Sequence, residues 1–111
     1  MSDFAAIRDQ LTGAGSPLEL RDIEVRGVPM REYVNAPATM RDIWALARGH
    51  GDTCYIVYED EHHSYADVDA QVRALADVLV NQCGVGPGDR VAVAMRNYPE
   101  WIMSYLSLIH I

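Results

Sequence analysis

The fold is decided by one stretch, residues 84–101, which has the sequence GVGPGDRVAVAMRNYPEW. Gly84 can adopt the positive φ that ends a helix, and the Pro-Gly-Asp run at 87–89 supplies the residues of a tight turn. The apolar block Val91 to Met95 is short and β-branched at alternate positions, which is typical of a strand covered on both faces. Asn97, two residues before a proline, predicts the start of the next helix. The order helix, turn, buried strand and helix indicates an α/β fold.

Two helices are predicted upstream of this stretch. Thr39 and Asp42, and likewise Ser64 and Asp67, have the spacing of a capping box before an apolar pattern. The second helix, residues 66–82, is the most strongly indicated because its apolar residues recur at steps of three and four. We expect this apolar stripe to be buried against the predicted strand at residues 91–95. Its other side carries the polar residues Asp67, Asp69, Gln71, Arg73 and Asp77, which we interpret as a solvated face. The first helix, over residues 40–48, should bury Met40, Ile43, Trp44 and Ala47.

Shorter elements are predicted elsewhere. Residues 54–58 are aromatic and β-branched and lead through an acidic turn to residues 62–64, which indicates a β-hairpin. The first part of the chain predicts a helix over Asp3 to Leu11 and a strand near Ile23 to Val28. We interpret residues 1–31 as an N-terminal lead-in that packs on something larger.

Composition narrows the classes of function. The 111 residues carry a formal net charge of −7, so the chain lacks the basic surface with which proteins bind nucleic acid. No basic segment followed by an apolar run begins the sequence, and no stretch reaches the roughly 18 apolar residues of a membrane span. We therefore expect a cytoplasmic protein without a transmembrane segment. Cys54 and Cys83 are expected to be reduced core residues rather than a disulfide.

Several groups have ligand-binding chemistry, and each also has a plainer interpretation. The glycine-rich run 84–88 is similar in composition to a dinucleotide-binding loop, but it follows a helix, and Pro87 removes a donor, which favours a helix cap and turn. His62 and His63 could ligate a metal beside the acidic residues 59–61. Adjacent side chains of an extended segment point to opposite faces, which favours a solvated hairpin. An acid–base pair among the three aspartates Asp67, Asp69 and Asp77 is likewise less favoured than a solvated face.

Arg96 and Asn97 follow the carboxyl end of the predicted strand, the edge at which open α/β sheets bind ligands. The alternative is that Asn97 caps its helix and Arg96 pairs with an acid such as Glu100. Three aromatic residues that could line a pocket, or belong to the core, are Trp44, Trp101 and Tyr105. No run of Gly with Ser, Thr and Lys offers a phosphate cradle. The sequence therefore predicts no catalytic, cofactor-binding or metal-binding residue in this chain.

A set of short motifs carries a family resemblance. In chain order they are Tyr58-Glu59-Asp60, SYADV at 64–68, Ala74-Leu75-Ala76, GVGPGDRVAV at 84–93 and RNYPEW at 96–101. In this order and spacing they resemble the start of the large domain of the AMP-forming acid–CoA ligases, which belong to the acyl-adenylate-forming superfamily. The similarity covers roughly residues 31–105, and it implies that residues 32–105 are the truncated start of that domain, followed by a tail at residues 106–111. Together with Asn35-Ala36-Pro37, the run Asn-Tyr-Pro-Glu-Trp is most similar to bacterial fatty-acyl or aryl acid ligases.

The resemblance implies an enzyme that uses ATP and Mg²⁺ to convert a carboxylic acid to an acyl-adenylate and then transfers the acyl group to coenzyme A. The family's phosphate loop, its Tyr-Gly-x-Thr-Glu segment, its ribose-binding Asp and its C-terminal Lys have no counterpart in these residues. The matched segment is therefore expected to be scaffold. As an isolated fragment it should be inactive, should bind none of these cofactors, and should self-associate because its sheet lacks neighbouring strands.

Two other interpretations remain open for the chain. It could be a self-contained, non-catalytic α/β binding module, or part of an adenylation domain that loads a carrier protein. The last six residues, Leu106–Ile111, are what the codons CTG TCT CTT ATA CAC ATC encode, a transposon end used in preparing sequencing libraries. We interpret them as a non-native tail. The alternative is a native helix end, because Trp101, Tyr105 and Ile109 keep helical spacing.

Overall fold

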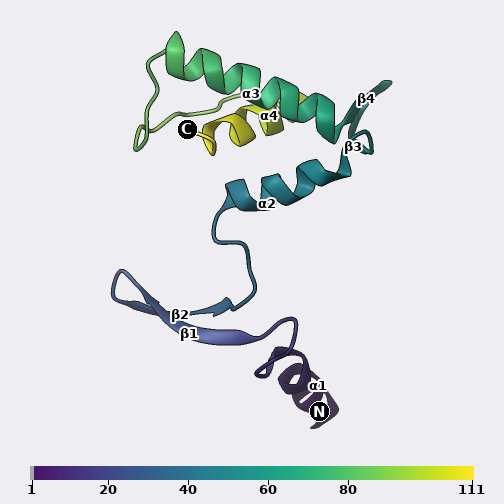
Figure 1. Cartoon of the computed structure of the whole chain (residues 1–111), viewed down its shortest axis with the longest axis vertical. Coiled ribbons are helices and arrows are strands. Elements are labelled where there is room, and N and C mark those ends of the chain that lie inside the picture. The colour runs from purple at the N-terminus through teal and green to yellow at the C-terminus, as the bar shows by residue number, and fades with distance from the viewer. Residues whose placement is uncertain (1) are drawn as a thin grey trace. The chain divides into compact units, whose positions relative to one another are not determined.

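The computed structural model describes residues 2–111 and divides into two compact units, one ending at Ala38 and the other spanning Thr39–Ile111. Helices and antiparallel hairpins build both units (Figure 1). The elements are α1 (Ser2–Thr12), β1 (Leu20–Val25), β2 (Val28–Tyr33), α2 (Met40–Ala47), the 3₁₀ turn η1 (Arg48–His50), β3 (Cys54–Tyr58), β4 (Glu61–Ser64), α3 (Tyr65–Asn81) and α4 (Pro99–Leu108). The chain is thus a mixed α/β protein, as its sequence predicts.

The N-terminal unit consists of α1 and the hairpin β1–β2. The expected helix over Asp3 to Leu11 is confirmed by α1, but the single strand expected near Ile23 to Val28 is wrong. Arg26 and Gly27 both have positive φ, 51° and 81°, and form the two-residue turn of a hairpin. The predicted strand therefore spans the turn, and β2 continues to Tyr33. The boundary predicted between the lead-in and the larger domain, at residues 31 and 32, falls inside β2. This boundary stays a prediction.

The core of the second unit lies where α2, α3 and α4 meet. Val68 and Val72, one helical turn apart on α3, are fully buried, and Trp44 of α2 is 3% exposed. Met103 and Leu106 of α4 complete this cluster. Figure 1 shows α3 and α4 side by side, with the hairpin β3–β4 at the start of α3. The apolar stripe of α3 therefore packs against helices.

Two reciprocal capping boxes fix the starts of α2 and α3, as their sequences predict. The Asp42 N–H donates to Thr39 Oγ1 at 3.1 Å, and the Thr39 N–H donates to an Asp42 carboxylate oxygen at 3.0 Å. Ser64 and Asp67 repeat both bonds at 3.1 and 3.0 Å. These contacts satisfy amide donors that a helix start otherwise leaves unpaired.

The hairpin β3–β4 contains a bulge that changes which side chains reach the core. Tyr58 pairs with Glu61, Val57 with His62 and Ile56 with His63, but Ser64 then pairs with Cys54 rather than with Tyr55. The extra residue lets both Tyr55 and Ile56 pack against the core, although neighbours on a regular strand face opposite sides. Tyr55 stacks on Tyr65 with ring centroids 4.4 Å apart.

The strand expected at Val91 to Met95 is not formed within residues 2–111. This segment is irregular, has no strand partner in that range, and leaves Val91 and Met95 42% and 45% exposed. The preceding turn is as predicted, because Gly84 and Gly88 have φ of 71° and 91° and the Asp89 N–H donates to the Gly86 carbonyl. A parallel strand requires a neighbour, and the described chain places none beside it. The expectation that α3 covers this strand is therefore wrong.

Two smaller expectations also need correction. Tyr98, not Asn97, is the N-cap of α4, and within the described residues no side chain caps it; Pro99 occupies the first turn instead. Met40 and Ile43 are about half exposed, because α2 turns only part of its apolar side toward the core. In contrast, Leu106 and Ser107 are buried, and the Ser107 hydroxyl is shared between the Val72 and Met103 carbonyls. The proposal of a non-native tail from residue 106 nevertheless stays a prediction.

Candidate functional site

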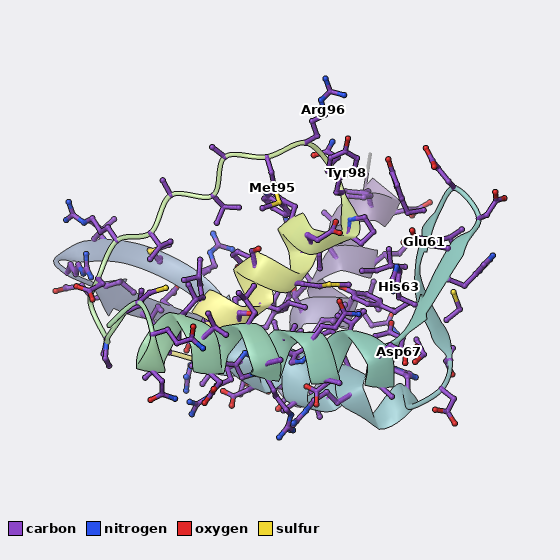
Figure 2. All side chains as sticks on the ribbon, turned by 90° about the horizontal axis from the view of Figure 1, so that it is seen from above. Glu61, His63, Asp67, Met95, Arg96 and Tyr98 are labelled. Atoms are coloured by element: carbon purple, nitrogen blue, oxygen red, sulfur yellow. The ribbon has the colours of Figure 1, made fainter. Side chains whose placement is uncertain are left out.

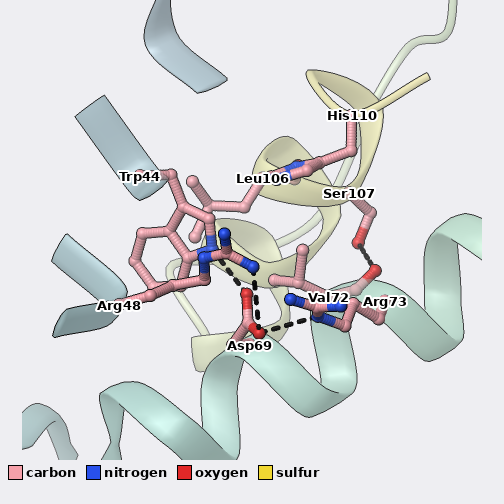
Figure 3. Close-up of polar contacts among 8 residues, drawn as sticks. All are labelled: Trp44, Arg48, Asp69, Val72, Arg73, Leu106, Ser107 and His110. Atoms are coloured by element: carbon pink, nitrogen blue, oxygen red, sulfur yellow. Dashed lines mark hydrogen bonds and ion pairs between the residues drawn. The ribbon is translucent and has the colours of Figure 1, made fainter. Parts of the chain in front are cut away.

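A polar cluster centred on Asp69 joins α2 to α3 (Figure 3). The Trp44 Nε1–H donates to one Asp69 carboxylate oxygen at 3.0 Å, and Arg73 Nε donates to the other at 2.7 Å. An Arg48 nitrogen lies 3.7 Å from that second oxygen. The Asp69 side chain is only 17% exposed. The prediction that Asp69 lies on a solvated face of its helix is therefore wrong.

The pKa of Asp69 lies below its ordinary value of 3.8. Burial alone would raise this pKa, but the hydrogen bonds from Arg73 and Trp44 and the charges of Arg73 and Arg48 outweigh burial. Asp69 is therefore ionised at neutral pH and serves as an acceptor. A carboxylate that accepts hydrogen bonds from an indole and a guanidinium, with a second guanidinium nearby, is a weak base, so we interpret the cluster as a contact that stabilises the fold.

The glycine-rich loop does not fit a phosphate group. The Asp89 carboxylate accepts a hydrogen bond from the Gly86 N–H at 2.8 Å, so a side chain of this chain occupies the amide that an anion would need. A phosphate approaching Gly86 would also meet the negative charge of Asp89. The Gly86–Asp89 segment forms a turn, and the absence of an ATP contact at residues 84–89 stays a prediction.

The two histidines of the hairpin have different neighbours. His63 Nε2 lies 3.2 Å from a Glu61 carboxylate oxygen, whereas His62 Nδ1 lies 3.8 Å from the Cys54 sulfur. Residues 2–111 bring together no group of three or more His, Cys, Asp or Glu side chains that could hold a metal ion. Cys54 and Cys83 are free thiols, but both are exposed, so the prediction that they are core residues is wrong.

Arg96 and Asn97 lie on the open segment before α4. Figure 2 shows the Arg96 side chain pointing away from the helices, while Met95 and Tyr98 lie nearer to them. Its expected pairing with Glu100 is not among the ion pairs of the described residues. A ligand-binding edge at Arg96 stays a prediction, because the strand that would create that edge is not formed here.

The aromatic residues line shallow apolar hollows. One, of about 320 Å³, brings together all three aromatic residues singled out in the sequence, Trp44, Trp101 and Tyr105. Another, of about 350 Å³, lies between β3 and the start of α4 and includes Tyr58 and Tyr98, whose rings meet edge to face at 5.6 Å. Trp44 belongs to the core, whereas Trp101 and Tyr105 are about 40% exposed and stack on each other.

Comparison with known proteins places this second unit in a family. The sequence model described as AMP-binding enzyme matches residues 43–111, which include most of α2 and all of the hairpin β3–β4, α3, the glycine turn and α4. The chain belongs to the AMP-binding enzyme family. The first unit, with α1 and the hairpin β1–β2, lies outside the matched range.

Curated proteins are similar to this chain over a short segment. The medium/long-chain-fatty-acid–CoA ligase FadD6 of Mycobacterium tuberculosis is 33% identical over 63 residues, which are 57% of this chain and 10% of the relative. Long-chain fatty acid transport protein 6 of Homo sapiens is 33% identical over 54 residues, 49% of this chain and 9% of the relative. The chain therefore spans about a tenth of the length of these relatives. No solved structure matches significantly, and none of the described helices has the length and apolar composition to cross a membrane.

Sequence reasoning missed the Asp69 cluster and the Cys54–His62 contact. Both connect residues on different elements or across a bulge, and helical or strand periodicity of one segment does not encode them. The sequence did contain one indication of the Asp69 cluster, the Trp44 side chain, because a buried indole N–H requires a hydrogen-bond acceptor. Asp69 is the carboxylate that satisfies it.

Proposed function

We propose that this chain is part of an AMP-forming acid–CoA ligase that activates a fatty or aryl carboxylic acid with ATP and Mg²⁺ and transfers it to coenzyme A. The observation that supports the proposal is the family match over residues 43–111, joined by a relative named as a fatty-acid–CoA ligase. Within such an enzyme, residues 32–105 would be scaffold. A cytoplasmic location stays part of this proposal.

The residues of this chain would support rather than perform the chemistry. The Gly86–Asp89 turn is closed by its own carboxylate, and Asp69 is held by Trp44 and Arg73. We therefore expect the isolated 111-residue chain to form no acyl-adenylate. In calorimetry it should show no binding of MgATP or coenzyme A. Micromolar affinity, equivalent to about −8 kcal/mol, would contradict the scaffold role.

The test of the ligase itself requires the gene that contains this segment. The reading frame that contains residues 43–105 should encode a Gly-rich phosphate loop, and its purified product should convert a fatty or aryl acid, ATP and coenzyme A to acyl-CoA and AMP. Release of pyrophosphate without acyl-CoA, followed by loading of a carrier protein, would instead support the adenylation-domain alternative. A frame without the phosphate loop would favour the non-catalytic module.

A further inference from the structure

An exposed thiol and an imidazole lie in contact on the hairpin β3–β4. Cys54 Sγ is 3.8 Å from Nδ1 of His62 and 3.7 Å from the Ile56 carbonyl oxygen. Both distances are within hydrogen-bonding range for sulfur, so the single thiol proton has two alternative acceptors, the Ile56 carbonyl and His62 Nδ1. The side chains of Cys54 and His62 are both exposed. Neither residue belongs to the core or to the Asp69 cluster.

The β-bulge creates this contact. Val57 and His62 form a pair and share the outer face of the hairpin, where Val57 is 62% exposed. On a regular strand the next outward position would be Tyr55, and Cys54 would face the core. Because the bulge adds Tyr55 as an extra residue, Cys54 takes the outward position opposite Ser64 and becomes the diagonal neighbour of His62.

The geometry suits proton transfer from the thiol. The thiolate is the reactive form of cysteine, and an imidazole nitrogen in contact with the sulfur can accept its proton. Cys83 provides an internal comparison, since it is also free and exposed, but no histidine contacts it within the described residues. The acidic turn Glu59–Glu61 adjoins His62 in sequence and disfavours the approach of anionic reagents.

We propose that Cys54 and His62 form a thiol–imidazole pair that makes Cys54 a site of S-thiolation by neutral or cationic small disulfides. His62 Nδ1 accepts the thiol proton, and Cys54 Sγ attacks one sulfur of the disulfide. The S–S bond of the reagent breaks as the new mixed disulfide forms, and the released thiolate takes up the proton. The disulfide is itself the two-electron oxidant, so no other co-reactant is needed. This inference does not depend on the ligase function.

The test compares the two cysteines of the 111-residue chain with the neutral reagent 2,2′-dithiodipyridine. Cys83→Ser leaves only Cys54, Cys54→Ser leaves only Cys83, and the thiopyridone released is followed by absorbance. We expect Cys54 to react about tenfold faster than Cys83, because only Cys54 has a base in contact. In a denaturant the two rates should become equal. Equal rates in the folded chain would overturn the proposal.

A second comparison assigns the effect to His62. In the Cys83→Ser background, His62→Gln should lower the rate at Cys54 to that of Cys83. His63→Gln is the matched control, since His63 faces the other side of the hairpin and contacts Glu61. An unchanged rate in a folded His62→Gln variant, checked by circular dichroism, would remove the imidazole from the proposal. The comparison of the two cysteines keeps His62 intact, so it decides the question even if that variant unfolds.

Discussion

Asp69 shows how one side chain can connect two helices. Its carboxylate accepts a hydrogen bond from the buried Trp44 indole N–H and pairs with the exposed Arg73, so removing it leaves the buried indole N–H without an acceptor. We expect Asp69→Ala to lower the free energy of unfolding by about 2–3 kcal/mol, measured by urea denaturation followed by tryptophan fluorescence.

Asp77 is the matched control for this substitution. It lies two turns further along α3, is exposed, and within the described residues accepts a hydrogen bond only from Asn81, one turn away. Asp77→Ala should change the free energy of unfolding by no more than about 0.5 kcal/mol. Similar losses from the two substitutions would show that Asp69 has no special role.

The lowered pKa of Asp69 also predicts an acid sensitivity. Since its pKa in the folded chain lies below the ordinary 3.8, the stabilisation is fully present above that value and is lost as the pH falls toward the folded pKa. We expect the urea midpoint to fall on acidification from about pH 5 to about pH 3. Asp69→Asn should flatten this fall. Asp67, whose pKa the Ser64 hydroxyl lowers, contributes with the same sign, so part of the slope should persist.

Helix starts give a prediction at the scale of elements. Ser64 caps α3 in both directions, so Ser64→Ala should cost about 1 kcal/mol in the free energy of unfolding. Asn97 was expected to cap α4, but Tyr98 holds the N-cap position, so Asn97→Ala should be nearly neutral. Both values come from thermal unfolding monitored by circular dichroism at 222 nm. A loss at Asn97 as large as that at Ser64 would reverse this assignment of the helix start.

Elements whose hydrogen bonds are local were predictable from the sequence. The capping boxes, α3, the hairpin β3–β4 and the glycine turn all depend on partners a few residues apart, and all are confirmed. The structure of residues 91–95 could not be predicted in this way. An apolar segment forms a strand only when neighbouring strands supply its hydrogen-bond partners. The Asp69 cluster could not be predicted for a related reason. Trp44 lies 25 positions from Asp69, and the periodicity of α3 carries no information on a contact with another helix.

At the scale of the whole molecule, the small core predicts marginal stability. Five hydrophobic residues form the buried cluster, while Ile43, Trp101 and Tyr105 each stay at least 40% exposed. We expect the 111-residue chain to self-associate with rising concentration and to unfold over a broad range, because exposed apolar surface favours association. Size-exclusion chromatography and thermal unfolding measure both. A monodisperse monomer with one sharp transition near 60 °C, as complete domains show, would support the self-contained module.

The irregular structure of residues 91–95 predicts how fast their amide hydrogens exchange with deuterium. Within residues 2–111 these amides donate to no backbone carbonyl, so they should exchange with deuterium almost as fast as in an unstructured peptide. The amides of α3 near Val68 and Val72 should exchange slowest in the chain. If the segment gains its strand partners in a longer protein, its exchange should slow by orders of magnitude while α3 changes little. Deuterium uptake at these five residues therefore reports, peptide by peptide, whether the sheet around them has been assembled.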